Sequence, residues 1–262
     1  MKKVKIRVIT AFPVDSKAPT RVLADLKKYE SDGIEISLSS NKAGAAYFNS
    51  DTEQFLSMGA LVFEAIAAEK EGCDAIVIES GADTGLEACR EVVSIPVVGL
   101  ADIAFRTASM LGRKFGLMAL QDWHGYAIER MIKKYQLTDQ YCGHFTTVGS
   151  TPFWVGEEKK DNHRLETAMK GIRSLIDEYN ADTIVMGGSY FCDMNDDIKA
   201  KLLEEGYGDI VLINQLPLAI NFAETLVKSK LCHSKKIYAI PRTSTAVFGY
   251  KDITVTPSLE NM

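Results

Sequence analysis

Two short apolar runs constrain the fold of this chain more than any other feature of its sequence. The run AIVI follows Asp74, and the run TIVM follows Asp182. Neither run alternates apolar with polar residues, which is typical of central strands in a parallel sheet that helices cover on both faces. Around them, short β-rich segments alternate with longer stretches whose apolar residues recur every three or four positions. This alternation predicts an α/β fold.

The expected elements follow from the same periodicity. We expect strands at 4–9, 34–38, 75–78, 115–120, 145–148, 183–186 and 210–213. We expect helices at 20–29, 52–71, 86–92, 101–111, 124–135, 158–179, 195–205 and 217–228. The tail at 232–262 loses the helical period and is expected to form extended segments broken by prolines.

The two apolar runs belong to a faint internal repeat. DAIVIESG at 74–81 matches DTIVMGGS at 182–189, which predicts two pseudo-symmetric parallel-sheet, Rossmann-like halves. We assign 1–100 plus 217–262 to the N-terminal half and 101–216 to the C-terminal half. Ligands of open α/β sheets bind at the carboxyl ends of strands. We therefore expect the site in a cleft between the halves, with Ser80 and Gly188 facing each other across a shared cavity.

Composition and charge restrict the partners. Apolar residues make up 46% of the 262 residues and charged residues 25%, which is typical of a globular protein. The net charge of −5 provides no positive field for nucleic acid or an anionic membrane. The five cysteines contain no CxxC pair, and their odd number favours a reducing compartment. No apolar run is long enough to span a membrane, so we expect a cytoplasmic protein.

Several known catalytic motifs are absent, and two small-residue turns remain. The sequence has no GxxxxGK[ST], GxGxxG, HExxH or GxSxG motif, and we expect no metal and no cofactor. The first turn, residues 80–85, and the second turn, residues 187–189, follow the two apolar runs. Their amide groups are candidates to bind a carboxylate or another anionic oxygen. Alternatively, their glycines only permit tight turns.

The segment 74–117 resembles the aspartate/glutamate/hydantoin racemase superfamily, most closely its hydantoin and allantoin racemase branch. The resemblance lies in the strand, the D-x-G-L turn at 83–86, the IPVVG run at 95–99 and the A-x-x-LGR-x-F segment at 108–115. DTIVMGGS and the later LINQLPLAINFAETLV at 212–227 continue it in order. The resemblance covers about 10 to 230 and excludes the tail.

The resemblance implies a small-molecule substrate, anionic or ureide, bound between two halves that each contribute one catalytic cysteine. In that family one thiolate removes the α-proton and the other thiol protonates the opposite face, without metal or pyridoxal phosphate. Family members are usually oligomeric, so we expect a homo-oligomer. Here the two cysteine positions hold Ser80 and Gly188. The polar substrate loop of the family also differs, since Thr10-Ala11-Phe12-Pro13 follows the first strand.

Other residues must therefore carry any proton transfer. Our catalytic candidates are Ser80, His124 and Cys192. Our substrate-binding candidates are Thr10, Gly81, Ala82, Gly187, Gly188, Ser189 and Tyr190.

Each candidate also has a structural interpretation. Cys192 fits a buried packing residue, and His124 fits the first turn of a helix with Asp122 as its N-cap. Glu79 and Asp83 are possible carboxylate bases, although Asp83 also fits a cap of the helix that follows it. Tyr190 and Asp193 could present a phenol or a carboxylate.

We expect a cofactor-independent racemase-superfamily enzyme acting on a small carboxylate, amino-acid derivative or cyclic ureide. Replacement of both thiols leaves lyase, decarboxylase or one-base isomerase chemistry as alternatives. A carboxylate-binding protein without activity is a second hypothesis. A hydrolase with Ser80 as nucleophile and His124 as base is a third.

Overall fold

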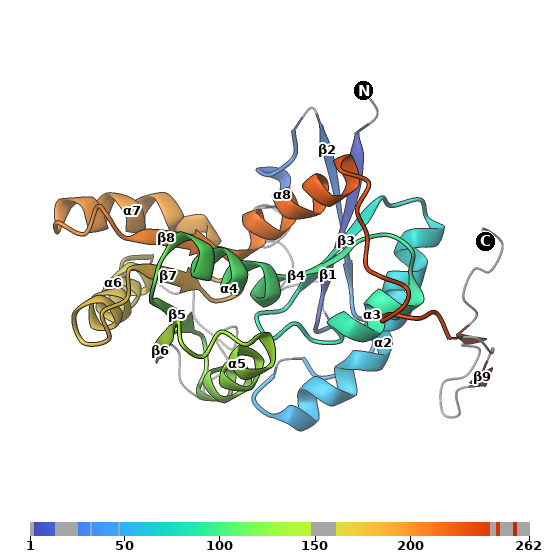
Figure 1. Ribbon diagram of the computed structural model, residues 1–262, viewed down its shortest axis with the longest axis horizontal. Coiled ribbons are helices and arrows are strands. Elements are labelled where there is room, and N and C mark those ends of the chain that lie inside the picture. Colours follow the sequence, from blue (N-terminus) through green and yellow to red (C-terminus); the bar gives the residue numbers. More distant parts are fainter. Residues whose placement is uncertain are drawn as a thin grey trace.

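Two four-stranded parallel sheets form the centre of the protein. The computed structural model describes residues 3–13, 26–31, 33–46, 48–147, 161–241, 245–246 and 254–255. The first sheet has the order β2-β1-β3-β4, with β1 at Val4–Thr10, β2 at Ile34–Ser40, β3 at Ala75–Glu79 and β4 at Val97–Gly99. The second sheet has the order β6-β5-β7-β8, with β5 at Phe115–Ala119, β6 at Tyr141–Thr146, β7 at Thr183–Met186 and β8 at Val211–Asn214. Figure 1 shows the second sheet to the left of the first.

The two sheets repeat one topology, as the internal repeat predicts. In each sheet the first strand in sequence lies between the second and the third, and every pair is parallel. The aspartates at matching positions of the repeat also make equivalent hydrogen bonds. Asp74 accepts the amide hydrogen of Lys5 at 2.9 Å, and Asp182 accepts that of Arg113 at 2.8 Å. Asp74 thus ties the start of β3 to the start of β1, and Asp182 ties the start of β7 to the residues just before β5.

Helices cover both faces of each sheet. The helices are α2 (Asp51–Lys70), α3 (Leu86–Val92), α4 (Leu100–Leu111), α5 (Asp122–Tyr135), α6 (Asp161–Asp177), α7 (Asn195–Glu204) and α8 (Gln215–Lys228), with a short 3-10 helix η1 at Cys192–Met194. In the first sheet α2 and α3 cover one face and α8 the other. In the second sheet α4 and α5 cover one face, and α6 and α7 the other. All residues of β3 and β7 are accordingly buried, as expected for strands enclosed on both sides.

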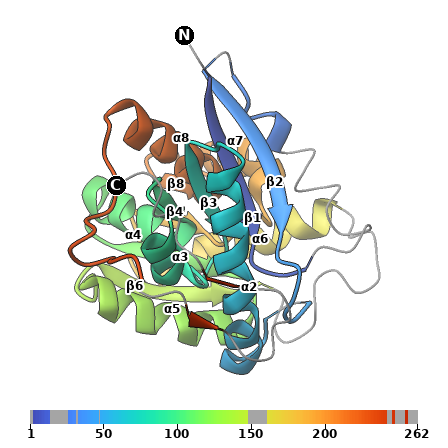
Figure 2. The same cartoon turned by 90° about the vertical axis from the view of Figure 1, so that its right-hand side faces the viewer.

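Two helices are exchanged between the halves. Helix α4 follows the first sheet directly but packs on β7 and β8, whereas α8 follows the second sheet and packs on β1 and β3. The two helices also pack against each other between the sheets, where Figures 1 and 2 show them. The domain boundaries given above stay a prediction.

Several predicted boundaries differ from the structure. Strand β4 was not expected, because its three residues are too short to show a period. Strand β6 spans 141–146 rather than 145–148, with every residue only half-buried, as suits an edge strand of mixed composition. Helix α5 starts two residues earlier than expected, with Gln121 rather than Asp122 at the N-cap. The predicted helix at 20–29 falls largely outside the described residues.

The C-terminal segment has little regular structure in its described residues. Residues 231–241 contain no helix, and β9 (Thr245–Ala246) pairs antiparallel with β10 (Thr254–Val255). Over the described ranges, a search for a helix of sufficient length and hydropathy to cross a bilayer finds none.

Candidate active site

The first and second turns approach each other closely at two glycines. The turns begin where β3 and β7 end, at the carboxyl edges of the two sheets. A Cβ atom placed on Gly81 would lie 3.5 Å from the amide nitrogen of Gly188 and 3.8 Å from its Cα atom. The two main chains therefore approach each other closely, with room for about one methyl group between Gly81 and Gly188. A ligand at this edge must lie beside this close approach.

Ser80 organises the first turn. Its buried hydroxyl lies 2.8 Å from Thr84 Oγ1 and accepts the amide hydrogens of Ala82 and Thr84, both at 3.4 Å. Its carbonyl oxygen accepts the amide hydrogen of Asp83 at 3.1 Å. These amides are used within the turn and are not free for an anion. In the described part of the chain Ser80 makes no hydrogen bond to His124, so the hydrolase hypothesis lacks the contact that would activate the hydroxyl.

Asp83 connects the first turn to α4 and α5. Its carboxylate accepts the amide hydrogens of Ala101 at 3.0 Å and Asp102 at 2.7 Å, and the hydroxyl hydrogen of Tyr135 at 2.8 Å. Asp83 therefore caps α4, not the helix that follows it, where Gly85 is the N-cap. Burial raises the pKa of Asp83 to about 6, while the three hydrogen bonds act to lower it. With its oxygens committed, Asp83 serves the structure of the site.

Gln215 completes the second turn from the neighbouring strand. It is the first residue of α8, directly after β8, and it is fully buried. Its Oε1 accepts the amide hydrogen of Gly188 at 2.7 Å. Because an N–H group must meet an oxygen, this bond fixes the orientation of the side-chain amide and makes Nε2 a donor. Nε2 is buried and has no hydrogen-bond partner among the described residues. Sequence analysis missed Gln215, although a glutamine directly after a strand at the carboxyl edge was a signal.

One side-chain contact joins the two turns across the halves. The hydroxyl of Ser189 donates to Oε1 of Glu79 at 2.9 Å, between residues 110 positions apart. Glu79 is the last residue of β3 and is 5% exposed. Burial raises the pKa of its carboxyl to about 7, and the Ser189 hydrogen bond acts to lower it. A carboxyl with this pKa exists in both protonation states near neutral pH, as an acid/base group requires.

Tyr190 and Asp193 are held by an arginine from α6. Arg164 is buried and pairs with both carboxylate oxygens of Asp193, at 2.9 Å and 2.8 Å. The same guanidinium donates to the carbonyl oxygen of Tyr190 and lies 4.7 Å from the centre of its ring. Asp193 is thus an ion-pair partner, and Tyr190 presents a ring held by a cation.

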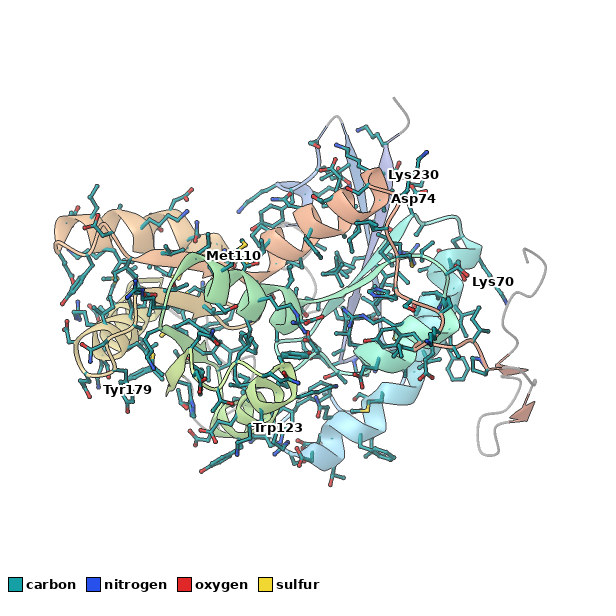
Figure 3. The ribbon with its side chains drawn as sticks, in the orientation of Figure 1. Lys70, Asp74, Met110, Trp123, Tyr179 and Lys230 are labelled. Atoms are coloured by element: carbon teal, nitrogen blue, oxygen red, sulfur yellow. The ribbon has the colours of Figure 1, made fainter. Side chains whose placement is uncertain are left out.

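The residues after β5 contribute a second buried amide and an aromatic group. Gln121 is buried, and its Nε2 has no hydrogen-bond partner in the described part of the chain. His124 follows within the first turn of α5, and burial lowers its pKa to about 4, so its imidazole is neutral at pH 7. Trp123 lies 5.1 Å from the His124 ring and donates to Asp51 of α2 at 2.9 Å. Figure 3 shows Trp123 at the edge where α5 approaches α2.

Thr10 and Cys192 are two further candidates, and both make contacts within the protein. The hydroxyl of Thr10, which is buried at the end of β1, donates to the carbonyl oxygen of Phe12 at 2.9 Å. Cys192 belongs to the core between α8 and the first sheet, and its Sγ lies 2.9 Å from Asn214 Oδ1. Both arrangements match the structural interpretation of these residues rather than a contact with a ligand.

The site therefore combines neutral donors with one buried carboxyl, that of Glu79, whose oxygens are not all committed to structural hydrogen bonds. Neither turn carries a lysine or arginine, and the nearby Arg164 is paired with Asp193. Searching the described residues for groups of three or more metal-binding side chains identifies none. This arrangement is suited to binding a neutral polar molecule and to transferring a proton.

Comparison with known proteins places this site in a family. The model of the Asp/Glu/Hydantoin racemase family matches residues 18–223. The hydantoin racemase of Pseudomonas sp. (strain NS671) is 28% identical over 204 residues, which cover 77% of this chain and 78% of the relative.

Solved structures show the same fold. The allantoin racemase from Klebsiella pneumoniae superposes with a TM-score of 0.82 at 21% identity, covering 94% of this chain and 96% of that one. The allantoin racemase from Pseudomonas fluorescens gives a TM-score of 0.79 at 21% identity, covering 93% and 99%. With its two sheets, its paired turns and a family match over most of its length, the chain belongs to the Asp/Glu/hydantoin racemase family.

Proposed function

We propose that this protein is an isomerase-type enzyme that transfers a proton at the carbon beside a carbonyl group in a small cyclic ureide. Family membership supports the reaction class, and the relatives named above are racemases of hydantoin and allantoin, which are cyclic ureides. The substrate, its handedness and the acid/base residues are our proposal for this chain.

The observation that carries the proposal is the pair of buried glutamines beside the second turn. Gln121 follows β5 and Gln215 follows β8, and β7 with the second turn lies between them. Each has a buried Nε2 without a partner among the described residues. A buried donor left unpaired costs about 1–3 kcal/mol, so such groups are normally matched by an acceptor. The carbonyl oxygens of a cyclic ureide are acceptors of this kind.

The charge of the site favours a neutral ligand over a carboxylate. An anion buried here would meet the carboxyl of Glu79 and neutral amides, with no unpaired cation on either turn. Burying an anion without a partner is strongly unfavourable. We therefore place amino acids and other carboxylates below cyclic ureides as substrates.

The chemistry needs donors as well as a base. Removing the α-proton sends its electron pair into the adjacent carbonyl, and the resulting oxyanion needs preorganised N–H groups. Gln215 Nε2 beside Gly188 supplies such a donor. In our proposal the first turn, with Ser80, Gly81 and Ala82, shapes the edge of the site, and His124 contributes only as a neutral ring.

Two other functions follow if the site lacks a competent acid/base pair. By our alignment the family thiols are replaced by Ser80 and Gly188. The same scaffold could then act as a lyase or decarboxylase, or bind a ligand without turnover. Neither alternative is supported by an observation comparable to the two buried glutamines, whose Nε2 groups have no partner among the described residues.

A deuterium-exchange experiment tests the proposal. The purified protein is incubated in heavy water with enantiopure 5-substituted hydantoins, free amino acids and α-substituted malonates, and the Cα proton is followed by NMR. We expect exchange with hydantoins and none with amino acids or malonates. Loss of carbon dioxide from malonates would support the decarboxylase, and binding by calorimetry without exchange would support the binding protein. Either result would contradict our proposal.

A further inference from the structure

We infer that Glu79 is the catalytic acid/base of this site, and that it takes the place of the family's thiols in moving the α-proton. The inference rests on the proposed function and names a residue that the comparisons do not assign. It is drawn from the position of Glu79 and from the few partners that its carboxyl has.

The position of Glu79 is the point where the two halves come together. It is the last residue of β3 and immediately precedes Ser80, and its Oε1 is held by Ser189, which immediately follows Gly188. Glu79 and Ser189 therefore flank the close approach between Gly81 and Gly188. A molecule bound beside that approach lies next to this carboxyl.

Comparison with the other buried carboxyls shows how unusual Glu79 is. Among described residues the buried carboxyl groups are those of Glu64, Glu79 and Asp83. Glu64 is paired with Lys42 at 3.1 Å, and Asp83 accepts three hydrogen bonds. Glu79 accepts one bond, from a neutral hydroxyl, and its Oε2 has no hydrogen-bond partner in the described ranges. A structural carboxylate in a side chain this little exposed is normally paired, so an oxygen of Glu79 left available to a ligand points to a function.

The electrostatics fit the role. Burial is the largest influence on the pKa of Glu79, which it raises to about 7, and the hydroxyl of Ser189 acts to lower it. Within the described part of the chain, no charged side chain contributes to the shift. The carboxylate and the acid are then both present near neutral pH, which is the condition under which a general acid/base is most effective.

The proposed step balances within the site. The Glu79 carboxylate removes the proton from the carbon between the ring carbonyl and the ring nitrogen, and the C–H electron pair becomes an enolate. Gln215 Nε2 holds the oxyanion, and the protonated Glu79 exchanges its proton with solvent or returns it to the carbon. Return to the same face gives exchange with retention, so one carboxyl should exchange deuterium faster than it inverts the centre.

The test uses the full chain with three variants and a control. Exchange and inversion of both enantiomers of a 5-substituted hydantoin are measured from pH 5 to 9 for the wild type, Glu79→Gln, Glu79→Asp and Ser189→Ala. Glu64→Gln is the matched control, because it removes a buried carboxyl outside the site. Circular dichroism confirms that each variant is folded.

We expect Glu79→Gln to lower the exchange rate about 10²–10⁴-fold, the usual contribution of general acid/base catalysis. Glu79→Asp should retain part of the rate, and Glu64→Gln all of it. Ser189→Ala should lower the exchange rate less than Glu79→Gln does. It should also move the midpoint of the pH profile upward, because the hydrogen bond that it removes acts to lower the pKa of Glu79.

The other outcomes separate the two proposals. Wild-type exchange that persists within fivefold in Glu79→Gln would overturn the role of Glu79 and leave the proposed function standing. A Ser189→Ala profile with an unchanged midpoint would equally count against Glu79 as the titrating group. Absence of exchange in the wild type with every hydantoin would overturn both. If Glu79→Gln does not fold, the Glu79→Asp and Ser189→Ala profiles decide.

Discussion

The side-chain oxygen of Gln215 accepts the amide hydrogen of Gly188 at 2.7 Å, and this bond joins the start of α8 to the second turn. Gly188 has a left-handed backbone with φ of +63°, which is a conformation that glycine adopts without strain. Since Oε1 is committed to the turn, the polar group that Gln215 can offer a ligand is Nε2. The same residue thus supports the shape of the turn and supplies its donor.

Substitution of Gln215 separates these two roles. Gln215→Glu keeps an oxygen for Gly188 but removes the N–H donor, whereas Gln215→Met removes both. Losing a hydrogen bond to a buried acceptor costs about 1–3 kcal/mol, so we expect Gln215→Glu to bind a neutral hydantoin roughly 5- to 150-fold more weakly, as measured by calorimetry.

Measuring the stability of both variants separates the loss of the Nε2 donor from the loss of the bond to Gly188. Gln215→Met should also lower the free energy of unfolding, because the Gly188 amide loses its acceptor. Gln215→Glu should lose less stability than Gln215→Met at low pH, where the new carboxyl is neutral. Unchanged hydantoin affinity in Gln215→Glu would show that Nε2 does not contact the ligand.

Restoring cysteines at the aligned positions tests whether Ser80 and Gly188 stand where the family has its thiols. Among the described residues a Cβ on Gly188 would meet Leu120 Cδ1 alone, at 3.8 Å, so these residues leave room for a side chain there. The left-handed backbone adds a strain of roughly 1 kcal/mol. We expect the Ser80→Cys/Gly188→Cys double variant to fold and to invert hydantoins faster, relative to its exchange rate, than the wild type does.

The adjacent glycine provides the control. A Cβ on Gly187 would lie 2.3 Å from the carbonyl oxygen of Met118. Because that atom belongs to the main chain of β5, it cannot move aside cheaply. Gly187→Ala should therefore be far less stable to urea than the Gly188→Cys single variant. A stable Gly187→Ala protein would contradict the placement of the second turn. A double variant with no gain in inversion would contradict the placement of the thiols.

The sequence predicted the fold well because the fold depends on local patterns. The apolar runs after Asp74 and Asp182 predicted two equivalent central strands, and the aspartates fix their starts in the same way. The repeat also identified the two turns as neighbours. It could not predict how closely they approach each other, since that depends on how α4 and α8 are exchanged between the sheets.

The side chains of the site were harder to predict, because their roles depend on contacts between distant residues. From the sequence, Glu79 and Asp83 were both possible bases, and Asp83 also fitted a cap of the helix that follows it. The structure distinguishes them, since Asp83 caps α4 while Glu79 accepts one hydroxyl from a residue 110 positions away. Likewise, Cys192 and Thr10 have polar atoms, but these contact neighbouring protein oxygens.

Removing the Asp83 carboxyl should destabilise the protein without a direct effect on proton transfer. Asp83→Ala deletes the cap of α4 and leaves the Tyr135 hydroxyl without its acceptor. Loss of a cap costs about 0.5–2 kcal/mol and an unpaired buried hydroxyl about 1–3 kcal/mol. We expect urea unfolding to show a loss of roughly 2–4 kcal/mol. Tyr135→Phe, which leaves the cap intact, should lose less than half of this amount.

The pH dependence of stability offers a check on Glu79 that needs no substrate. The pKa of its carboxyl is about 7 in the folded protein, against an ordinary value of 4.5. Below pH 4.5 the group is protonated in both states and has no effect. Between these values the unfolded chain releases its proton first, so the free energy of unfolding falls as the pH rises. The loss amounts to roughly 3 kcal/mol and is complete above pH 7.

Glu79→Gln should remove this loss, because the amide still accepts from Ser189 but does not ionise. The variant should therefore become progressively more stable than the wild type between pH 4.5 and 7.5, by up to roughly 3 kcal/mol in urea unfolding. Asp83 titrates in both proteins, so its contribution cancels in the difference between their free energies of unfolding. Ser189→Ala should increase the loss, since the hydroxyl acts to lower the pKa. A stability difference that does not change with pH would mean that Glu79 ionises in the folded protein as it does in the unfolded chain, and that its burial has not prepared it for proton transfer.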